Sequence, residues 1–200
     1  MMEVTFLLCV TNKFAEADIS GKIIQNYKKI KPTLYVVYNG SDPNFPHDVY
    51  TSNPGHSIGH YPQIKKGFEK ARNISSRRVC VLCADDFLLN EDKIIEIYER
   101  MDKEKSCYSG SLWFDNGALS TEIFFVDLKW GDPIIDWEHN ASEGLIEETF
   151  RKHVDKNGFK WTLIPERTPN HRFMCAELHW TMEHDINKSI EHARSWGYEI

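Results

Sequence analysis

The sequence predicts an α/β protein whose mostly parallel sheet is flanked by helices. In the first half of the chain, short apolar runs rich in β-branched residues alternate with segments of helical spacing. This alternation is typical of parallel strands that are joined by crossover helices. The runs predicted as strands are Val4–Thr11, Thr33–Tyr38, His47–Ser52 and Val79–Cys83. A chain of 200 residues can bury a substantial core, so we expect a single domain over residues 1–200.

Apolar residues at helical spacing predict three helices between and after these strands. Isoleucines on one face predict a helix over Asp18–Lys31, which Pro32 is expected to end. A second helix is predicted around Ile64–Ala71. The third follows Asn90, whose side chain is a suitable N-cap for the segment EDKIIEIYERM.

The second half of the chain is predicted to extend the same domain. Strands are expected at Cys107–Trp113, Glu122–Leu128 and Phe159–Ile164. A helix is expected to start at Ser142 and to run to about His153. The tail from Met182 to Ser195 also has helical spacing, and no linker separates it from the rest.

Composition and charge argue against several classes of function. Lys and Arg number 24 against 30 Asp and Glu, and the net charge of −6 argues against binding to nucleic acid or to an anionic membrane surface. No apolar run approaches the roughly 20 residues that a membrane span needs, and we recognise no signal peptide. The five cysteines are odd in number and lie mostly in apolar runs. They indicate buried thiols in a reducing compartment, so we expect a cytoplasmic protein.

Two carboxylates, Asp85 and Asp86, directly follow the buried strand Val79–Cys83. In open α/β sheets, ligands bind outside the carboxyl ends of the strands. The segments Thr11–Phe14 and Asn39–Asp42 follow two other strands and are expected at the same edge, together with the glycine-containing stretch 53–60. The sequence therefore predicts a metal or sugar site at this edge.

Several short motifs follow one another in an order that is known from one enzyme family. They are Val10-Thr11-Asn12, Tyr38-Asn39-Gly40-Ser41-Asp42, Asn53-Pro54-Gly55, Cys83-Ala84-Asp85-Asp86-Phe87-Leu88-Leu89 and the stretch from Glu143 to Pro165. Over about residues 3–165, this order resembles the nucleotide-sugar-dependent glycosyltransferases of the A-type (GT-A) fold, nearest to the large inverting family of polysaccharide synthases. The chain departs from the family's D-x-D motif, because Cys83 stands where a first acid is usual. The register of the metal motif therefore stays open between Asp85 and Asp86.

The resemblance implies a single-domain nucleotide-diphospho-sugar transferase with a Rossmann-like mixed sheet. Residues 1–105 or so would form the nucleotide and donor half, and residues 106–200 the acceptor half. The implied reaction is hexosyl or deoxyhexosyl transfer from a nucleotide-sugar, with a UDP-sugar expected, to a glycan or glycoconjugate acceptor, with inversion, in polysaccharide biosynthesis. Mn²⁺ or Mg²⁺ would neutralise the diphosphate leaving group.

The resemblance also implies roles for individual residues. Asp86 is the expected metal ligand, Asp85 contacts the ribose or donor sugar, and His171 is a candidate second ligand, with His179 next. The residues expected around the nucleotide are Thr11, Asn39, Ser41, Asp42 and Lys65, with Lys66 as an alternative to Lys65 at the phosphates. Glu143 is the expected general base. Its rivals are Asp136, Glu138 and Glu147. Candidate platforms for an acceptor sugar are Trp113, Trp130 and Trp137.

Each of these side chains also has a plain structural explanation, such as ending a strand, forming a turn or packing in the core. A non-catalytic nucleotide-sugar or carbohydrate-binding module of the same fold is therefore the alternative to an enzyme. Adjacent carboxylates such as Asp85 and Asp86 cannot straddle a glycosidic bond, which argues against a glycosidase.

Overall fold

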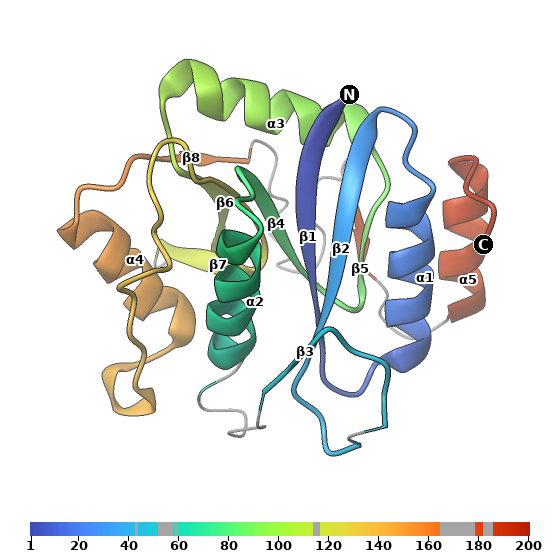
Figure 1. Ribbon diagram of the computed structural model, residues 1–200, viewed down its shortest axis with the longest axis horizontal. Coiled ribbons are helices and arrows are strands. Elements are labelled where there is room, and N and C mark those ends of the chain that lie inside the picture. The colour runs from blue at the N-terminus through green and yellow to red at the C-terminus, as the bar shows by residue number, and fades with distance from the viewer. Residues whose placement is uncertain (43, 52–57, 59, 114–116, 165–178, 182–185) are drawn as a thin grey trace.

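Seven strands form one mixed sheet at the centre of the molecule (Figure 1). The computed structural model describes residues 1–42, 44–51, 58, 60–113, 117–164, 179–181 and 186–200. The strand order is β3-β2-β1-β4-β7-β6-β8. The strands are β1 (Met2–Val10), β2 (Ile30–Tyr38), β3 (Val49–Tyr50), β4 (Arg78–Cys83), β6 (Tyr108–Trp113), β7 (Ala118–Asp127) and β8 (Trp161–Leu163). Strands β1 to β4 are mutually parallel, and β7 joins them antiparallel to β4, which confirms the predicted mostly parallel α/β sheet.

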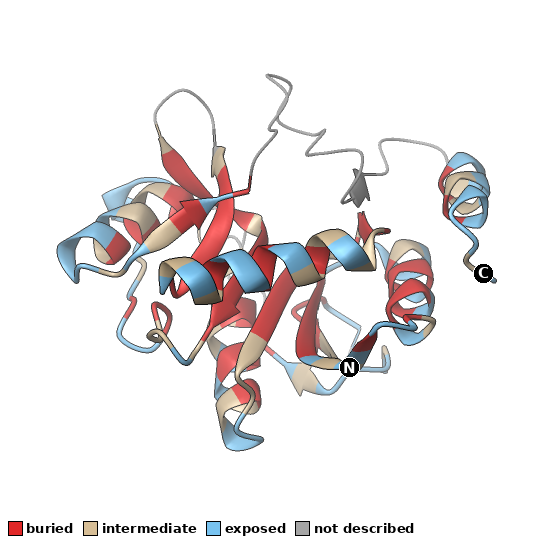
Figure 2. Cartoon of the chain, turned by 90° about the horizontal axis from the view of Figure 1, so that it is seen from above, coloured by how far each residue is buried: buried red, intermediate tan, exposed pale blue. Residues whose placement is uncertain are grey.

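Helices cover both faces of this sheet, as predicted (Figure 1). Along β1, Phe6 and Leu8 face one core and Leu7 and Cys9 face the other, because successive side chains of a strand point to opposite faces. The first core also contains residues of α1 (Phe14–Gln25), α3 (Glu91–Glu104) and α5 (Ile186–Ser195). The second contains residues of α2 (Tyr61–Asn73) and α4 (Ile146–Lys156). Figure 2 shows the buried strands between the two helical layers, whose outer surfaces are exposed.

Several local signals predicted their elements correctly. Asn90 caps α3, since its Oδ1 accepts from the backbone N–H of Asp92 at 3.0 Å and of Lys93 at 3.3 Å. The apolar run ending at Cys83 is the buried strand β4, and Phe68 and Ala71 of α2 are fully buried. In the part of the chain that the structure describes, no helix is long and apolar enough to span a membrane.

The first helix is shorter than predicted. It ends at Gln25, and β2 begins at Ile30, before the proline that was expected to end the helix. Tyr27 and Ile30 are buried as their apolar character indicates, but they lie beyond the helix. Pro32 is tolerated in β2 because the described part of β3 pairs only with Val37 and Tyr38, which leaves the earlier part of β2 at an edge.

The late helix starts later than predicted, at Ile146 rather than at Ser142. Residues Ala141–Glu143 form a separate 3₁₀ turn, η1, capped by Asn140, whose Oδ1 accepts from Ser142 N–H at 3.1 Å. Gly144 has φ = 113°, a conformation that L side chains rarely adopt, and it separates the two segments. Glu143 therefore lies in the turn, and the acids of the first turn of α4 are Glu147 and Glu148.

A small second sheet forms beside the first one. Strand β5 (Asp86–Leu88) follows β4 after a two-residue turn and pairs antiparallel with β9 (His179–Thr181). The Oγ of Ser20 in α1 donates to the carbonyl of Asp86 at 3.0 Å, and the Tyr27 hydroxyl donates to the carbonyl of Leu88 at 2.6 Å. The second of the two predicted acids is thus part of a strand and not of a free loop.

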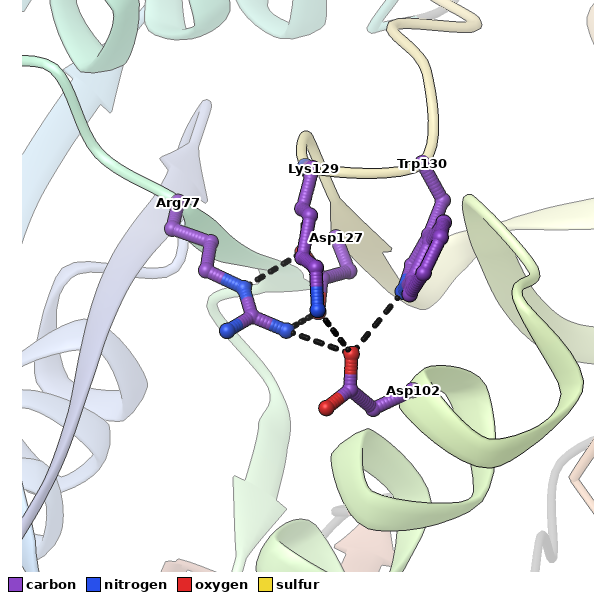
Figure 3. A network of polar contacts seen from close by, with 5 residues as sticks. All are labelled: Arg77, Asp102, Asp127, Lys129 and Trp130. Carbon is purple, nitrogen blue, oxygen red and sulfur yellow. Dashed lines mark hydrogen bonds and ion pairs between the residues drawn. The ribbon is translucent and has the colours of Figure 1, made fainter.

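A polar network closes the amino edge of the sheet, where β4 begins beside the end of β7 (Figure 3). The Arg77 guanidinium donates to both carboxylate oxygens of Asp127 at 2.9 and 2.8 Å. It also donates to Asp102 at 2.8 Å, whose carboxylate further accepts from Lys129 and from the indole N–H of Trp130. Because the Asp127 side chain is 0% exposed, it depends on Arg77 for charge compensation.

Replacing Arg77 with Met is expected to lower the free energy of unfolding by about 3 kcal/mol, because it leaves the buried Asp127 carboxylate without its partner. Urea unfolding measures the change. The control Lys66→Met removes an exposed ion pair with Glu69 and should cost no more than about 0.5 kcal/mol. Equal effects of the two substitutions would contradict the role given to Arg77.

Candidate functional site

The carboxyl ends of β1, β2 and β4 are held together by a few specific hydrogen bonds. The backbone N–H of Asn39 donates to the Val10 carbonyl at 3.1 Å, and that of Ala84 donates to the Cys9 carbonyl at 3.0 Å. From the first turn of α2, the buried Gln63 amide donates to the carbonyls of Val10 and Val37 at 2.9 and 2.8 Å. These bonds bring the segments after the three strands together at one edge, as predicted. No local signal in the sequence marks Gln63 for this role.

The structure joins two of the residues predicted to hold the nucleotide. The Thr11 hydroxyl donates to the Asn39 side-chain carbonyl at 2.5 Å, which links the ends of β1 and β2. Asn39 is buried, whereas Thr11, Ser41 and Asp42 are exposed. The Asp42 carboxylate accepts from the backbone N–H of Asn44 at 2.9 Å, so it also shapes its own turn.

Aromatic rings gather around this turn, although no pattern in the sequence indicates that they meet. Tyr38 lies at the centre, with ring centroids at 4.8 Å from Phe45, 6.0 Å from Phe14 and 6.0 Å from Tyr50. Phe14 stacks on Phe45 at 4.5 Å, and both Phe14 and Tyr50 are exposed on their outer sides. A Cβ on Gly40 would lie 2.1 Å from the Tyr38 hydroxyl oxygen, so only glycine fits beside this ring. The cluster offers flat apolar surface beside exposed polar groups.

Asp85 lies at the tip of β4 in contact with the ammonium of Lys13, which follows β1. Burial lowers the pKa of Lys13, but the hydrogen bond and charge of Asp85, with the charges of Glu16 and Asp86, outweigh it and raise that pKa. Lys13 therefore stays an ammonium at neutral pH. Nothing in the neighbourhood of Lys13 along the chain indicates a carboxylate partner, so its contact could not be predicted from the sequence.

The two acids of the metal motif have different surroundings. Asp86 is only 5% exposed, and its backbone belongs to β5. The Asp85 side chain is 23% exposed. Within the described ranges, no group of three or more His, Cys, Asp or Glu side chains is arranged to hold a metal ion. His171 lies outside the described residues, and so does the side chain of His179.

A second polar cluster connects the first turns of α2 and α4. His60 Nε2 hydrogen-bonds to the Thr121 carbonyl at 2.6 Å, and the Thr121 hydroxyl donates to the buried Glu147 carboxylate at 3.0 Å. Nearby, the Tyr61 hydroxyl donates to Glu138 at 2.9 Å. Gln63 of the same α2 turn bonds to the ends of β1 and β2. The first turn of α2 thus connects Glu147 and Glu138 with the sheet edge at which Asp85 lies.

The predicted catalytic acids Asp136 and Glu143 line one open hollow of about 560 Å³, together with Glu138, Thr149, Lys152, His153 and Lys156. Both acids are exposed. The structure thus brings these two predicted residues together. No hydrogen bond or ion pair of the described residues joins either of them to Asp85.

Lys65 and Lys66 both have partners within the protein. The Lys65 ammonium donates to the carbonyls of Ile134, Ile135 and Trp137 at 3.2, 2.8 and 2.9 Å. Since an ammonium has three protons to donate, these carbonyls satisfy it and fit a structural role. Lys66 is exposed and pairs with Glu69 at 2.8 Å.

Two of the tryptophans predicted as acceptor platforms lie elsewhere. Trp137 is fully buried, with its ring 4.7 Å from that of Phe150, so it is a core residue. Trp130 belongs to the network with Asp102 at the opposite edge of the sheet (Figure 3). Core packing explains the position of Trp137, and the hydrogen bond to Asp102 explains that of Trp130. The side chain of Trp113 lies outside the described residues.

Three solved structures that share this fold are described as glycosyltransferases or nucleotide-diphospho-sugar transferases. One is a candidate nucleotide-diphospho-sugar transferase from Desulfovibrio desulfuricans G20, with a TM-score of 0.53 and 11% identity over 82% of this chain and 80% of that one. A second is a mutant of Drosophila β-1,4-galactosyltransferase 7 in complex with manganese, UDP-Gal and xylobiose, with a TM-score of 0.54 and 12% identity over 94% of this chain and 74% of that one. A third acts in glycosylation of the major capsid of PBCV-1, with a TM-score of 0.59 and 15% identity over 96% of this chain and 98% of that one.

The chain has the nucleotide-diphospho-sugar transferase fold. At 11–15% identity, the likeness establishes this GT-A fold and not the reaction. No family model matches the sequence, and no curated protein matches it. The reaction must therefore be argued from the residues at the carboxyl edge.

His60 is expected to make the stability of the fold depend on pH. Burial lowers its pKa below the ordinary 6.5, although the Thr121 carbonyl and the Glu147 charge partly oppose the shift. As the pH falls through 6.5, the unfolded chain takes up a proton that the folded chain still excludes, so stability present above 6.5 is lost below it. Urea unfolding at pH 7.5 and 5.5 should show a smaller loss in His60→Gln, which keeps an N–H donor but does not titrate. Equal losses in both proteins would contradict this role.

Proposed function

We propose that the chain is a metal-dependent glycosyltransferase that moves a sugar, with inversion, from a nucleotide-sugar to a glycan or glycoconjugate acceptor. The observation that carries this proposal is the meeting of Thr11, Asn39, Lys13 and Asp85 at the carboxyl ends of three parallel strands. This is the edge at which ligands bind in open α/β sheets. The likeness to the nucleotide-diphospho-sugar transferase fold supports a nucleotide-sugar as the ligand.

The donor nucleotide would bind in the turn after β2. The exposed Asp42 carboxylate and the hydroxyls of Thr11 and Ser41 can hydrogen-bond to ribose hydroxyls. The exposed rings of Phe14 and Tyr50 can stack on a base, since a π face tolerates any base and adds apolar contact. UDP is our first choice for the nucleotide because a manganese and UDP-Gal complex is known for a protein of this fold.

Asp85 is our preferred metal ligand, ahead of Asp86. Its side chain is more exposed than that of Asp86, and its carboxylate already has a cation, the Lys13 ammonium, in contact with it. One carboxylate suffices, because diphosphate oxygens and water complete the coordination that Mn²⁺ or Mg²⁺ needs. When bound, the metal would act as a Lewis acid that stabilises the diphosphate leaving group. Asp86 would hold β5 and the tip of β4 in place.

The general base would come from the start of α4. The resemblance assigns this role to the acid at the helix start, and the structure moves that start from Glu143 to Glu147 and Glu148. Glu147 is buried and already accepts from Thr121, so it is suited to positioning. Glu148 is half-buried, with Oε2 close above Gly144, and we prefer it as the group that takes the proton of the acceptor hydroxyl. Glu143 and Asp136 at the open hollow are the alternatives.

A screen of nucleotide-sugars with Mn²⁺ tests the proposal through two readouts, thermal stabilisation by the nucleoside diphosphate and its release from the donor. At a ligand concentration of 100 Kd, the nucleoside diphosphate with Mn²⁺ should raise the melting temperature by about 5 to 10 °C. Asp85→Asn should lose both stabilisation and release. Glu148→Gln should keep the stabilisation and lose about a hundredfold or more of the release rate.

Asp18→Asn is the matched control for Asp85→Asn. Asp18 is also an acid in an ion pair with a lysine, Lys22, but it is exposed and lies within α1. The substitution should leave both readouts unchanged. No stabilisation of the wild-type chain by any common nucleoside diphosphate would sink the proposal. Stabilisation without release from any donor would instead favour the non-catalytic binding module. Loss of release in Glu143→Gln but not in Glu148→Gln would return the base to Glu143.

A further inference from the structure

Lys13 stands at a place that is unfavourable for a cation. It is the residue directly before α1, with φ = −103° and ψ = 70°, and its side chain makes no capping hydrogen bond. The first turn of a helix carries partial positive charge from its unpaired N–H groups, so an ammonium there is repelled. The position of Lys13 is therefore explained by Asp85 and not by the helix.

The sheet itself brings Lys13 and Asp85 together. Cys9 of β1 and Cys83 of β4 are register partners in the parallel ladder, and the Ala84 N–H donates to the Cys9 carbonyl at 3.0 Å. Lys13 and Asp85 each lie only a few residues beyond this pair. Because the ladder fixes the backbone on both sides, the two side chains stay within reach of each other.

The contact is nevertheless weak enough to be exchanged. The side chains of Lys13 and Asp85 are 46% and 23% exposed, so water screens their attraction. Ion pairs of this exposure shift an equilibrium by about fivefold or less. A divalent cation carries twice the charge of an ammonium, and hard cations prefer carboxylate oxygens.

The charge around Lys13 also favours a divalent ion. Glu16 in the first turn of α1 and Asp86 in β5 act on the Lys13 charge together with Asp85. These charges favour a cation at this place, and a divalent cation would gain more from them than an ammonium does.

We propose that Lys13 is an internal competitor of the metal: its ammonium and the divalent cation are alternative partners of the Asp85 carboxylate. The inference rests on the proposed function, because the donor diphosphate gives the displaced ammonium a new partner on its flexible four-carbon stem. Without a nucleotide, metal binding must break the Lys13–Asp85 contact, and the Lys13 ammonium finds no new anionic partner. With a nucleoside diphosphate bound, the diphosphate is that new partner. Lys13 thereby couples the binding of metal to the binding of donor.

Titration of the protein with Mn²⁺ alone tests the competition between Lys13 and the metal without any activity assay. Binding is measured by the loss of the electron paramagnetic resonance signal of free Mn²⁺. Lys13→Met should bind Mn²⁺ more tightly than the wild type, by about two- to fivefold. The titration is then repeated with UDP and with GDP, which gives the factor by which each nucleotide tightens Mn²⁺ binding. In Lys13→Met this factor should be smaller, by about as much as the substitution tightens the binding of Mn²⁺ alone. Lys13→Arg keeps the charge and should behave like the wild type.

Lys22→Met is the matched control, since it removes an exposed lysine and its ion pair with Asp18 from the same helix. Its Mn²⁺ affinity should equal that of the wild type. Equal Mn²⁺ affinities of the wild type and Lys13→Met, or no Mn²⁺ binding by either, would overturn the competition. A different result would separate the two proposals. If Lys13→Met binds Mn²⁺ more tightly but the wild type binds no nucleotide, the proposed function is overturned and the competition stands.

Discussion

The parallel pairing of β1 with β2 on one side and with β4 on the other is the constraint on which the site depends. It sets Cys9 opposite both Val37 and Cys83, so the segments after the three strands leave the sheet at the same level. The Thr11–Asn39 hydrogen bond and the Lys13–Asp85 contact both follow from this register. A shift of one residue in either ladder would turn these side chains to the other face.

Apolar burial supplies the stability of this arrangement, and polar groups fix its details. Strand β1 contributes to the cores on both faces of the sheet, with Phe6 and Leu8 on one side and Leu7 and Cys9 on the other. Its sequence is therefore an unbroken apolar run. The two edges of the sheet then differ in chemistry. At the amino edge, Arg77 compensates a fully buried carboxylate and also lines a hollow of about 520 Å³ beside the starts of β1 and β4. At the carboxyl edge, the charged pair is partly exposed and open to exchange.

Features that depend on a few neighbouring residues could be predicted from the sequence. The buried strand β4, the Asn90 cap and the helical face of α2 all have local signals, and the structure has them where they were expected. The late start of α4 also had a local signal in Gly144, whose conformation interrupts the helical segment, but the acidic residues on both sides of it obscured the boundary. The mostly parallel character of the sheet, with helices on both faces, followed from the alternation of strands and helices.

Features that depend on distant partners could not be predicted in this way. Strand β5 pairs with residues roughly 90 positions later in the chain, and three residues carry too little periodicity to indicate a strand. Lys13 gains its importance only from Asp85, which is 72 positions away. Likewise, Lys65 and Trp137 have suitable chemistry for a ligand site, and only the fold shows that backbone carbonyls and the core occupy them.

The most direct test of the account is an NMR measurement on isotope-labelled protein with UDP and Mn²⁺. Bound manganese broadens nearby amide signals, with an effect that falls steeply with distance. We expect selective broadening of the amide signals of Thr11, Asn39 and Asp85 at the carboxyl edge, while the amide signal of Asp127 at the opposite edge keeps its intensity. Broadening centred on Asp127, or uniform broadening along the chain, would contradict it.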